Sequence, residues 1–587
     1  MINLKKILFI LNPHERKLGF LLLVTMFVMA LLDTIGVASI MPFIAVLSNP
    51  QIIETNGILN FIFRNSKIFG VNNDQQFLFL LGFLVFFLLI ISIVFKAFTT
   101  YAQARFSEMR GYAISSRLIR GYLFKPYTWF LQKNSSEISK NILEDVGIFV
   151  GVGLGELMQL VSKGLISILI LILLIIVDPK LALIVGVILC GIYWIIFYFL
   201  RNRLNLLGKE YYRNNELRFR YVSEAFNATR VIKLHHLEKN YTERFSKAAE
   251  IFARTATSSE IIRSLPRFFL EALIFGGVMI IILYLMVKTG SFGDSLPILS
   301  LYVFAGYRLM PALQQVYASL TRISFANSST EKIYNEFKKI ELIEESKDKN
   351  IFSINKSINL KNIHYQYPNS EKKVIEDISL SIPAKSKVGF IGTTGSGKTT
   401  IVDIILGLLE PIKGTLEVDD KILTSKNLRS WQRNIGYVPQ DIYLADDTIA
   451  SNIAFGLDPK DIDQKALENA SKIANIHEFI VEELPNKYKT IIGERGVRLS
   501  GGQCQRIAIA RALYQNPKVL ILDEATSALD NDTEKAVMDA INNLHKEITI
   551  IIIAHRLNTI KDCDIIFKID KGKIVDQGVF SDLISKN

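Results

Sequence analysis

The sequence predicts two domains of different fold class, an all-α domain with six membrane-spanning helices followed by an α/β domain. The chain has 587 residues, too many for one ordinary domain. Half of its residues are hydrophobic and the mean hydropathy is +0.28, which is rare in a soluble protein of this size. Near residue 330, long apolar runs give way to short β-branched strands, Gly-rich turns and amphipathic helices.

The six spans are predicted from apolar stretches that reach the roughly 20 residues a membrane helix needs. The weakest contains Arg308 and Pro311. Residues 1–17 carry basic residues around a short apolar run, as a signal peptide does, but no small-residue cleavage site follows. We therefore interpret them as an interfacial helix. The six stretches are residues 19–47, 76–101, 149–177, 181–200, 268–287 and 296–320.

Basic residues predict the orientation, because Lys and Arg concentrate in cytoplasmic loops. The predicted loops 105–140 and 201–267 are long and rich in these residues, whereas those around 178–180 and 288–294 are short and nearly neutral. The long loops, both termini and the second half of the chain are therefore expected in the cytoplasm.

The overall charge excludes little by itself. A net charge of +12 fits either nucleic acid or cytoplasmic loops facing anionic lipid. The hydrophobicity favours lipid, and no nucleic-acid-binding module is recognisable. Cys190, Cys504 and Cys563 match neither a disulfide framework nor a metal site, so we expect reduced thiols.

A Gly-rich loop follows a strand-like run at residues 387–391 and precedes an apolar helix. This order is the required context of a Walker A loop, whose backbone N–H groups cradle phosphate oxygens. Lys398 is expected to contact the β- and γ-phosphates of a nucleotide, and the Thr399 hydroxyl to ligate Mg²⁺. The loop residues are Gly392, Thr393, Thr394, Gly395, Ser396, Gly397, Lys398, Thr399 and Thr400.

An apolar run at residues 518–522 ends in two acids, Asp523 and Glu524. Such a run predicts a buried parallel strand with carboxylates at its tip. Asp523 fits the Walker B role of holding Mg²⁺ and its water. Glu524 fits the general base that polarises the attacking water.

Between these motifs lies the sequence Leu499-Ser500-Gly501-Gly502-Gln503. Ser500 and two glycines opening a helix make a second phosphate-binding helix N-terminus. The pentapeptide is the signature of the ATP-binding-cassette (ABC) family, which the chain resembles over nearly its whole length. The resemblance implies that Ser500, Gly501, Gly502 and Gln503 contact the γ-phosphate of ATP held by another subunit.

Further positions resemble functional elements of this family. Tyr367 resembles the aromatic that stacks on adenine, although a core tyrosine at a strand end is the alternative. Gln440 resembles the Q-loop glutamine, which senses Mg²⁺ and the membrane domain, and His555 resembles the switch histidine near the γ-phosphate. The segment 527–530 resembles the D-loop and residues 493–496 a loop of exporters. Cys504 departs from the family, since many relatives carry a basic residue there.

The resemblance implies a type IV ABC exporter-like fold, in which the six-helix transmembrane domain is fused to an α/β P-loop nucleotide-binding domain. We expect the membrane domain at residues 1–330, a linker at 331–350 and the nucleotide-binding domain at 351–587. One chain carries one cassette, so a homodimer is the simplest assembly. The expected ligands are ATP and Mg²⁺. Residues 126–130 and 223–227 look like coupling helices; plain packing is the alternative for the aromatic run in the first.

Ionisable residues inside the predicted spans are candidates for contact with the transported molecule, because charge in a membrane is costly. Lys96, Arg267 and Arg308 are accompanied by Asp33 and Glu271. The alternative is that these residues pair with one another or reach the membrane surface. If they line the cavity, an excess of cations favours an anionic cargo such as a phosphate or pyrophosphate.

The first outer loop suggests an amphipathic helix on the membrane surface, with Ile58, Leu59, Ile62 and Phe69 near one face and Asn60, Arg64 and Lys67 near another. Such a helix could hold a lipid tail; an ordinary loop helix that caps the bundle is the alternative. With the segments 266–271 and 307–311, this feature makes the membrane half similar to bacterial lipid-linked oligosaccharide flippases of protein N-glycosylation. The resemblance implies flipping of a polyprenyl-pyrophosphate glycan from the cytoplasmic to the periplasmic leaflet of the bacterial inner membrane.

Other cargoes in the same fold stay open: a phospholipid, lipid A, an amphipathic drug or a peptide. A drug fits the cationic residues poorly. An ATP-gated channel is a rival of another class, and the intact Glu524 argues against it. An importer would carry its cassette on a separate chain, and the six predicted spans exclude a soluble cassette of DNA repair or translation.

Overall fold

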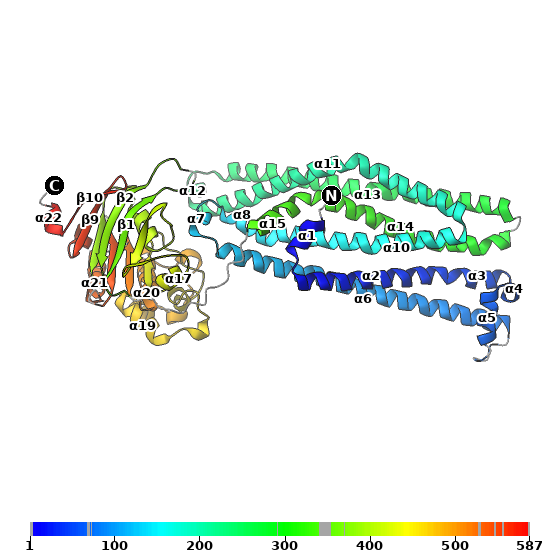
Figure 1. Ribbon diagram of the computed structural model, residues 1–587, viewed down its shortest axis with the longest axis horizontal. Coiled ribbons are helices and arrows are strands. Elements are labelled where there is room, and N and C mark those ends of the chain that lie inside the picture. The colour runs from blue at the N-terminus through cyan, green and yellow to red at the C-terminus, as the bar shows by residue number, and fades with distance from the viewer. Residues whose placement is uncertain are drawn as a thin grey trace. The chain divides into compact units, whose positions relative to one another are not determined.

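The chain divides into two compact units, which are shown in Figure 1. The helical unit comprises Met1–Lys125 and Lys133–Ile343, and the sheet unit comprises Pro126–Gln132 and Glu344–Asn587. The computed structural model describes residues 4–66, 68, 71, 73–289, 292–339, 354–368, 370–525, 530–544, 547–554 and 557–584.

The helical unit consists of long helices joined by short ones. Three of them, α6, α11 and α13, have 50, 49 and 52 residues. In chain order the elements are α1 (Leu4–Ile10), α2 (Pro13–Ala38), α3 (Ile40–Ser48), α4 (Ile52–Thr55), α5 (Gly57–Ser66), α6 (Asp74–Leu123), α8 (Ser135–Lys140), η2 (Asn141–Asp145), α9 (Val146–Ile148), η3 (Phe149–Gly155), α10 (Glu156–Val177), α11 (Pro179–Asn227), α12 (Thr229–Leu234), α13 (Glu238–Thr289), α14 (Phe292–Phe325) and α15 (Asn327–Lys339).

Within the described residues, five helical segments are long and apolar enough to cross a membrane. Each contains one of the predicted spans. The remaining prediction, residues 268–287, falls within α13, where several side chains lie outside the described part of the chain. The five segments are Pro13–Ser48, Asp74–Leu123, Ser135–Val177, Pro179–Asn227 and Leu296–Phe325.

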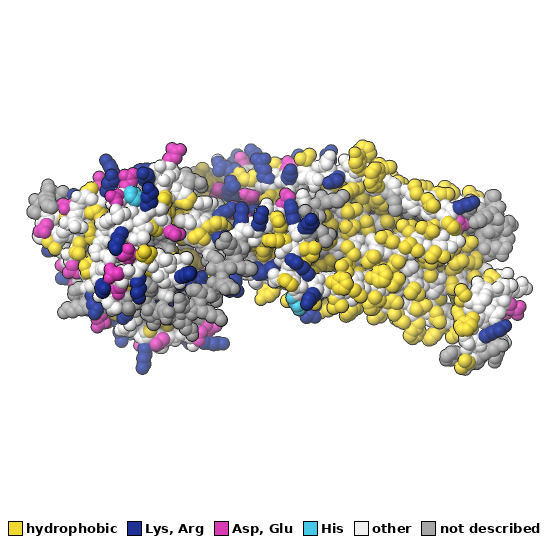
Figure 2. Space-filling view, in the orientation of Figure 1, with side chains coloured by type: hydrophobic (Ala, Val, Ile, Leu, Met, Phe, Trp, Pro, Cys, Tyr) yellow, Lys and Arg dark blue, Asp and Glu magenta, His cyan; other side chains and the backbone are white. Residues whose placement is uncertain are grey.

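The predicted cytoplasmic loops are largely helical. At about 1.5 Å per residue, a helix of some 50 residues is about two and a half times as long as the roughly 30 Å hydrocarbon core. Its apolar part can span the bilayer while the rest continues through the basic sequence. Figure 2 agrees with this division: hydrophobic side chains cover one stretch of the helical unit, and Lys and Arg gather over the adjoining stretch with α1 and α15.

A glycine brings α11 against the end of α14. A Cβ atom on Gly208 would lie 2.3 Å from the carbonyl oxygen of Phe325, so only glycine fits without backbone movement. Small residues let membrane helices approach closely in this way.

Gly208→Ala is expected to destabilise the helical unit by about 1–3 kcal/mol, because the two backbones must separate. A lower melting temperature of the purified protein in detergent would show this. Gly191→Ala is the matched control, since a Cβ atom at this other position of α11 meets no atom within 4 Å. Equal melting temperatures for the two variants would contradict the contact.

Two π-helical segments, η2 and η3, interrupt the helix that leads into α10. In a π-helix the hydrogen bonds join residues five apart, so such residues share a face. Lys140 and Asp145 are five apart and almost fully buried, and their Nζ and Oδ1 atoms lie 3.2 Å apart. The π turn thus places a buried ion pair inside one helix.

Side chains from two neighbouring helices, α11 and α15, make further contacts with this ion pair. The Tyr212 hydroxyl of α11 donates to Asp145 Oδ2 at 3.1 Å, and Lys140 Nζ lies 3.7 Å from the centre of the Tyr212 ring. Lys332 of α15 lies 3.5 Å from Glu137 and 3.8 Å from Asp145. We call these five residues the lysine–aspartate cluster. It joins α8, η2, α11 and α15 through charged contacts.

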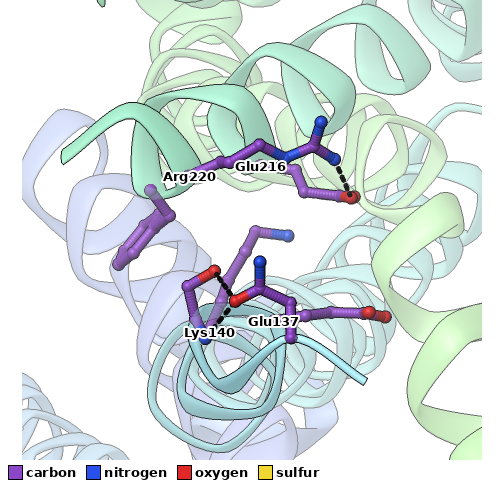
Figure 3. Close-up of a pocket in the computed structure, with 7 residues that line it drawn as sticks. Glu137, Lys140, Glu216 and Arg220 are labelled. Atoms are coloured by element: carbon purple, nitrogen blue, oxygen red, sulfur yellow. Dashed lines mark hydrogen bonds and ion pairs between the residues drawn. The ribbon is translucent and has the colours of Figure 1, made fainter. Parts of the chain in front are cut away.

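A small polar pocket of about 40 Å³ adjoins this cluster. Figure 3 shows Glu216 and Arg220 of α11 facing Glu137 and Lys140 of α8 across it. The volume holds a few water molecules at most. The pocket is therefore large enough for water at the edge of the cluster.

The sheet unit contains two sheets. One has the order β2-β1-β4-β5 and is antiparallel; the other has the order β10-β9-β3-β8-β7-β6 and is parallel except at β10. The strands of the two sheets are, in chain order, β1 (Ser357–Tyr365), β2 (Ile375–Pro383), β3 (Lys387–Ile391), β4 (Lys413–Val418), β5 (Lys421–Ile422), β6 (Ile435–Val438), β7 (Val519–Asp523), β8 (Thr549–Ile553), β9 (Ile565–Asp570) and β10 (Lys573–Gly578).

Helices complete the sheet unit and cover its larger sheet. Both faces of this sheet are buried, which is why β7 and β8 are continuous apolar runs. The helices are α7 (Tyr127–Phe130), α16 (Lys398–Ile405), α17 (Leu428–Gln432), α18 (Ile449–Ile453), η4 (Pro459–Asp461), α19 (Gln464–Ile473), η5 (Phe479–Glu483), η6 (Lys487–Lys489), η7 (Glu494–Gly496), α20 (Gly501–Tyr514), α21 (Asn531–Leu544), η8 (Leu557–Ile560) and α22 (Phe580–Ile584).

Candidate active site

Three predicted motifs meet where neighbouring parallel strands end. The Gly-rich loop follows β3, the two acids end and follow β7, and Gln440 comes two residues after β6. In the sheet, β8 separates β3 from β7, and β6 adjoins β7. The carboxyl ends of parallel strands share one edge, which is where open α/β sheets bind ligands.

The Gly-rich loop has the backbone of a phosphate-binding loop. Gly392, Gly395 and Gly397 have φ values of +153°, +79° and +106°. At Gly392 a Cβ atom would also lie 2.1 Å from the carbonyl oxygen of Ile569. The loop therefore needs glycine to turn its N–H groups inward. The buried Ser396 hydroxyl has no hydrogen-bond partner within the described residues, so it adds a polar group that suits phosphate.

Lys398 begins α16 and folds back over the loop. Its Nζ donates to the carbonyl oxygens of Gly392 at 2.9 Å and Thr393 at 3.0 Å. Burial lowers the pKa of Lys398, while Glu524 and Asp523 act in the opposite direction. The Lys398 ammonium, which is predicted to contact phosphate, thus lies within the electrostatic field of Asp523 and Glu524.

Asp523 is buried at the end of β7, and Glu524 follows with a φ of +51°. Positive φ is unusual for a residue with a side chain and is concentrated at functional sites. The Glu524 N–H donates to Ile553 O at 3.1 Å, and its Oε2 accepts from Gln440 Nε2 at 3.0 Å. The structure therefore brings Gln440, Glu524 and Lys398 together.

A residue without a predicted role also supports Glu524. The buried Gln505 of α20 donates from Nε2 to the Glu524 carbonyl oxygen at 3.2 Å. This bond connects the helix of the signature sequence to the predicted general base within one chain. No sequence pattern marked Gln505, because the contact depends on how α20 packs beneath β7.

The residues present fit ATP and Mg²⁺. Thr399 is exposed, and its hydroxyl, the Asp523 carboxylate and the Gln440 amide are oxygen donors of the kind that Mg²⁺ prefers. No cluster of three His, Cys, Asp or Glu side chains suited to a metal occurs in the described chain. Mg²⁺ held by one carboxylate and by nucleotide phosphates needs no such cluster.

Tyr367 lies beside the Walker A helix, where its hydroxyl is 3.2 Å from Thr400 Oγ1. Its ring meets that of Tyr365 edge to face, with 5.1 Å between the centres. Burial raises the pKa of the nearby Asp403 carboxyl to about 6, and the negative charge of Asp523 contributes to the same shift. This placement is compatible with the predicted adenine contact.

The first predicted coupling helix, α7, belongs to the sheet unit although it precedes most of the helical unit in the chain. Burial, followed by the proximity of Asp403 and Tyr367, raises the pKa of the Tyr127 hydroxyl. Tyr127 therefore lies within electrostatic range of the residue predicted to contact adenine. The second predicted segment, 223–227, forms the end of α11.

The signature sequence opens α20. The Ser500 hydroxyl accepts from the Gln503 N–H at 3.2 Å, and the Gln503 side chain accepts from the Ser500 N–H at 2.8 Å. This capping box uses the Gln503 side chain within the helix. Ser500 and Gly501 are exposed, and Gly502 is half-buried.

Some predicted positions lie outside the described residues: His555, residues 527–529 of the D-loop segment, and Phe69 and Lys67 of the outer helix. Cys504 is half-buried near Gly496, and burial raises the pKa of its thiol. It packs there as a small apolar side chain.

In the helical unit, two of the three predicted cargo residues lie near one another. Lys96 and Arg308 both lie within electrostatic range of Lys163 on α10, as does Asp33. Arg308 Nη1 lies 3.2 Å from the buried Asp33 Oδ1. We call these four residues the cation cluster. Sequence inspection missed Lys163; its position inside an apolar run was the available signal.

Arg267 is placed differently. Its Nε lies 2.8 Å from Glu271 Oε1, one turn away on α13, and its side chain is largely exposed. A second buried acid, Glu156 of α10, accepts hydrogen bonds from Ser319 and Gln315 and pairs with Arg322. The Arg267–Glu271 and Arg308–Asp33 pairs both match the alternative in which the predicted charges pair with one another.

Comparison with known families and proteins agrees with these observations. The family model for the ABC transporter transmembrane region matches residues 55–307, and that for ABC transporter matches residues 375–527. The ATP-dependent lipid A-core flippase of Bordetella avium (strain 197N) is 30% identical over 467 residues, covering 78% of this chain and 77% of that protein.

Two further similarities extend this comparison. The ATP-dependent lipid A-core flippase of Syntrophus aciditrophicus (strain SB) is 34% identical over 376 residues, covering 62% of this chain and 60% of that protein. The structure of a bacterial Atm1-family ABC exporter with ATP bound has a TM-score of 0.78 at 22% identity and covers 96% of both chains. The last similarity confirms the predicted fold.

Proposed function

Because this chain belongs to the ABC exporter family, in which ATP hydrolysis is coupled to transport, we propose that it flips an anionic lipid-linked oligosaccharide from the cytoplasmic to the outer leaflet. We assign the membrane domain to residues 1–330, the linker to 331–350 and the nucleotide-binding domain to 351–587. The proposed setting is a bacterial inner membrane with the nucleotide-binding domain in the cytoplasm.

The cation cluster carries the proposal for the cargo. In this cluster Arg308 pairs with Asp33, and Lys163 lies within electrostatic range of Lys96, Arg308 and Asp33. Charge within a membrane protein is costly unless it is paired, so an excess of cations favours an anionic ligand. A pyrophosphate-linked lipid supplies such a group.

A lipid A-type glycolipid is the second candidate. Two similar proteins are described as lipid A-core flippases, and a phosphorylated glycolipid also carries negative charge. The resemblance of residues 266–271 and 307–311 to oligosaccharide-lipid flippases favours the first candidate.

The proposed mechanism assigns each residue a physical task. Lys398 and the loop N–H groups hold phosphate, and Glu524 accepts the proton of the attacking water while Gln440 orients its carboxylate. When bound, Mg²⁺ supplies charge neutralisation to the phosphates. The exposed Ser500 and Gly501 face solvent in one chain, so a second copy can use them to close the nucleotide site.

Reconstitution in proteoliposomes tests the cargo. A fluorescent polyprenyl-pyrophosphate oligosaccharide is expected to leave the accessible leaflet only when ATP is present, and not with Glu524→Gln. Hydrolysis of ATP by the wild type without movement of this lipid would contradict the proposal. Movement of lipid A in the same vesicles would then support the second candidate.

Substitution of the Arg308 and Asp33 pair is expected to separate transport from hydrolysis. In Arg308→Gln combined with Asp33→Asn, both charges are removed and no buried carboxylate is left unpaired. Transport is expected to fall about tenfold or more, because a hydrogen bond to a charged group contributes roughly 1.5–3 kcal/mol. Basal ATPase activity is expected to stay within about twofold of the wild type, since neither residue lies in the nucleotide site.

Arg254→Gln is the matched control, because Arg254 is an exposed arginine paired with Glu250 on its own helix. It is expected to preserve both activities. A parallel loss of transport and ATPase activity in the double variant would show that the pair maintains the helical bundle instead of binding cargo.

A further inference from the structure

The backbone of Glu524 has a conformation that this residue type rarely adopts. Its φ of +51° lies in the left-handed region, where a β-carbon crowds the following carbonyl oxygen. Such a residue persists there only when its surroundings hold it in place. The direction of the Glu524 side chain therefore depends on what binds its two peptide groups.

Hydrogen bonds hold the peptide groups on both sides of Glu524. The pairing of β7 with β8 ends at Asp523 and Ile553, and the Glu524 N–H donates to the Ile553 carbonyl oxygen at 3.1 Å. The chain leaves the sheet after this bond, so the Glu524 carbonyl oxygen lies beyond the ladder. This oxygen accepts a hydrogen bond from Gln505 Nε2 of α20 at 3.2 Å. Strand β8 thus holds one side of the left-handed residue, and helix α20 holds the other.

Gln505 is well placed to make a precise contact. Its side chain is 3% exposed, and a buried amide that has lost its water needs hydrogen-bond partners within the protein. It lies on a helix whose start is fixed by the capping box of Ser500 and Gln503. Groups carried on helices are held more precisely than groups carried on loops.

The contact acts on the Glu524 carboxylate through the backbone. Gln505 binds the carbonyl oxygen, whereas the carboxylate itself accepts from Gln440 Nε2 at 3.0 Å. Rotation of the Glu524 peptide would swing the whole side chain away from Gln440. A displacement of about 1 Å between reacting groups can lower a rate about a hundredfold.

We propose that Gln505 is a positioning residue for ATP hydrolysis, which holds the Glu524 peptide so that the carboxylate points at the attacking water. The inference rests on the proposed role of Glu524 as the general base. In the proposed mechanism, Ser500 and Gly501 at the start of α20 serve the nucleotide site of a second copy. The same helix would therefore serve the site of its own chain through Gln505.

Gln505→Met tests the inference, because methionine has nearly the same length and offers no N–H donor. In the purified protein in proteoliposomes, kcat for ATP hydrolysis is expected to fall about tenfold or more, since the strained peptide loses a hydrogen bond. KM and the affinity for a fluorescent ATP analogue are expected to stay within about twofold of the wild type, because Lys398 and the Gly-rich loop are unchanged. A kcat equal to that of the wild type would overturn the inference.

Gln432→Met is the matched control. Gln432 of α17 also donates from Nε2 to a backbone carbonyl oxygen, that of Leu406, at 3.1 Å. The substitution removes the same kind of hydrogen bond from the same unit without touching Glu524. It is expected to preserve kcat even where it lowers the melting temperature as much as Gln505→Met does. Equal losses of kcat in the two variants would show a general effect of stability and would overturn the inference.

Combining Gln505→Met with Glu524→Gln separates positioning from a purely structural role. Without the general base, the position of residue 524 no longer affects proton transfer. The second substitution is therefore expected to change the residual single-turnover rate of Glu524→Gln by less than about twofold. A further fall by the same factor as in the wild-type background would show that Gln505 maintains the whole site, and it would overturn the positioning role.

The single variants distinguish this inference from the proposed mechanism. Turnover at the wild-type rate in Glu524→Gln would contradict the proposed general base, and the inference with it. Loss of turnover in Glu524→Gln, together with full turnover in Gln505→Met, would overturn the positioning role of Gln505 alone.

Discussion

Replacing Glu524 with glutamine is expected to lower steady ATP hydrolysis by roughly 10²–10⁴-fold, the usual contribution of a general base. Glutamine has the same shape, and its carbonyl oxygen can still accept the hydrogen bond that Gln440 donates to Glu524 at 3.0 Å. It cannot take a proton from water. The variant is therefore expected to bind ATP and to retain ATP-dependent thermal stabilisation.

Phosphate release from purified protein in lipid measures this effect. Glu482→Gln is the matched control, because Glu482 is an exposed glutamate of η5 outside the motifs described above. Its activity is expected to equal that of the wild type. Turnover at the wild-type rate in Glu524→Gln would show that another group activates the water.

Replacing Lys398 with alanine is expected to weaken ATP binding strongly and to abolish hydrolysis. Lys398 is 6% exposed, and its ammonium lies within hydrogen-bond distance of two carbonyl oxygens of the Gly-rich loop. Each hydrogen bond from this cation to phosphate contributes roughly 1.5–3 kcal/mol, so loss of the side chain is expected to weaken ATP binding about a hundredfold.

Binding of a fluorescent ATP analogue measures the affinity directly. Lys472→Ala removes an exposed lysine at the end of α19 and is expected to bind ATP as the wild type does. The two active-site variants are then expected to differ, because Glu524→Gln keeps the ATP affinity of the wild type without turnover, whereas Lys398→Ala loses most of that affinity. Full affinity in Lys398→Ala would contradict its assigned contact with phosphate.

Local sequence was sufficient to predict the arrangement of strand, Gly-rich loop and helix around Lys398. Strand β3, the glycines of the loop and helix α16 are contiguous, so their order alone determines where Lys398 lies. The all-buried pattern of β7 followed from an apolar run that ends in acids. Motifs of this kind depend on neighbouring residues and need no information about tertiary packing.

The segments 105–140 and 201–267, predicted as cytoplasmic loops, are helical for most of their length. Helices α6 and α11 continue through Leu123 and Asn227. The apolar run ends where the bilayer ends, but the helical hydrogen bonds do not. Hydropathy therefore located the spans and underestimated the helices that contain them.

Contacts between helices could not be predicted from one sequence. The pairing of Arg308 with Asp33 and the position of Lys163 depend on the rotation of α2, α10 and α14 about their axes. The contact between Gln505 and Glu524 depends likewise on the packing of α20. Such rotations are set by the interlocking of side chains on several helices.

The π turn at η2 also determines how α8, the helix that precedes it, is rotated about its axis. Each residue of an α-helix rotates the chain by about 100°, so one extra residue in a turn rotates α8 by about that angle relative to an uninterrupted helix. The direction in which Glu137 and Lys140 point is thus encoded in the number of residues between Asn141 and Asp145. A one-residue deletion there would preserve a continuous helix while turning these two side chains away from α11 and α15, a change that no single substitution reproduces.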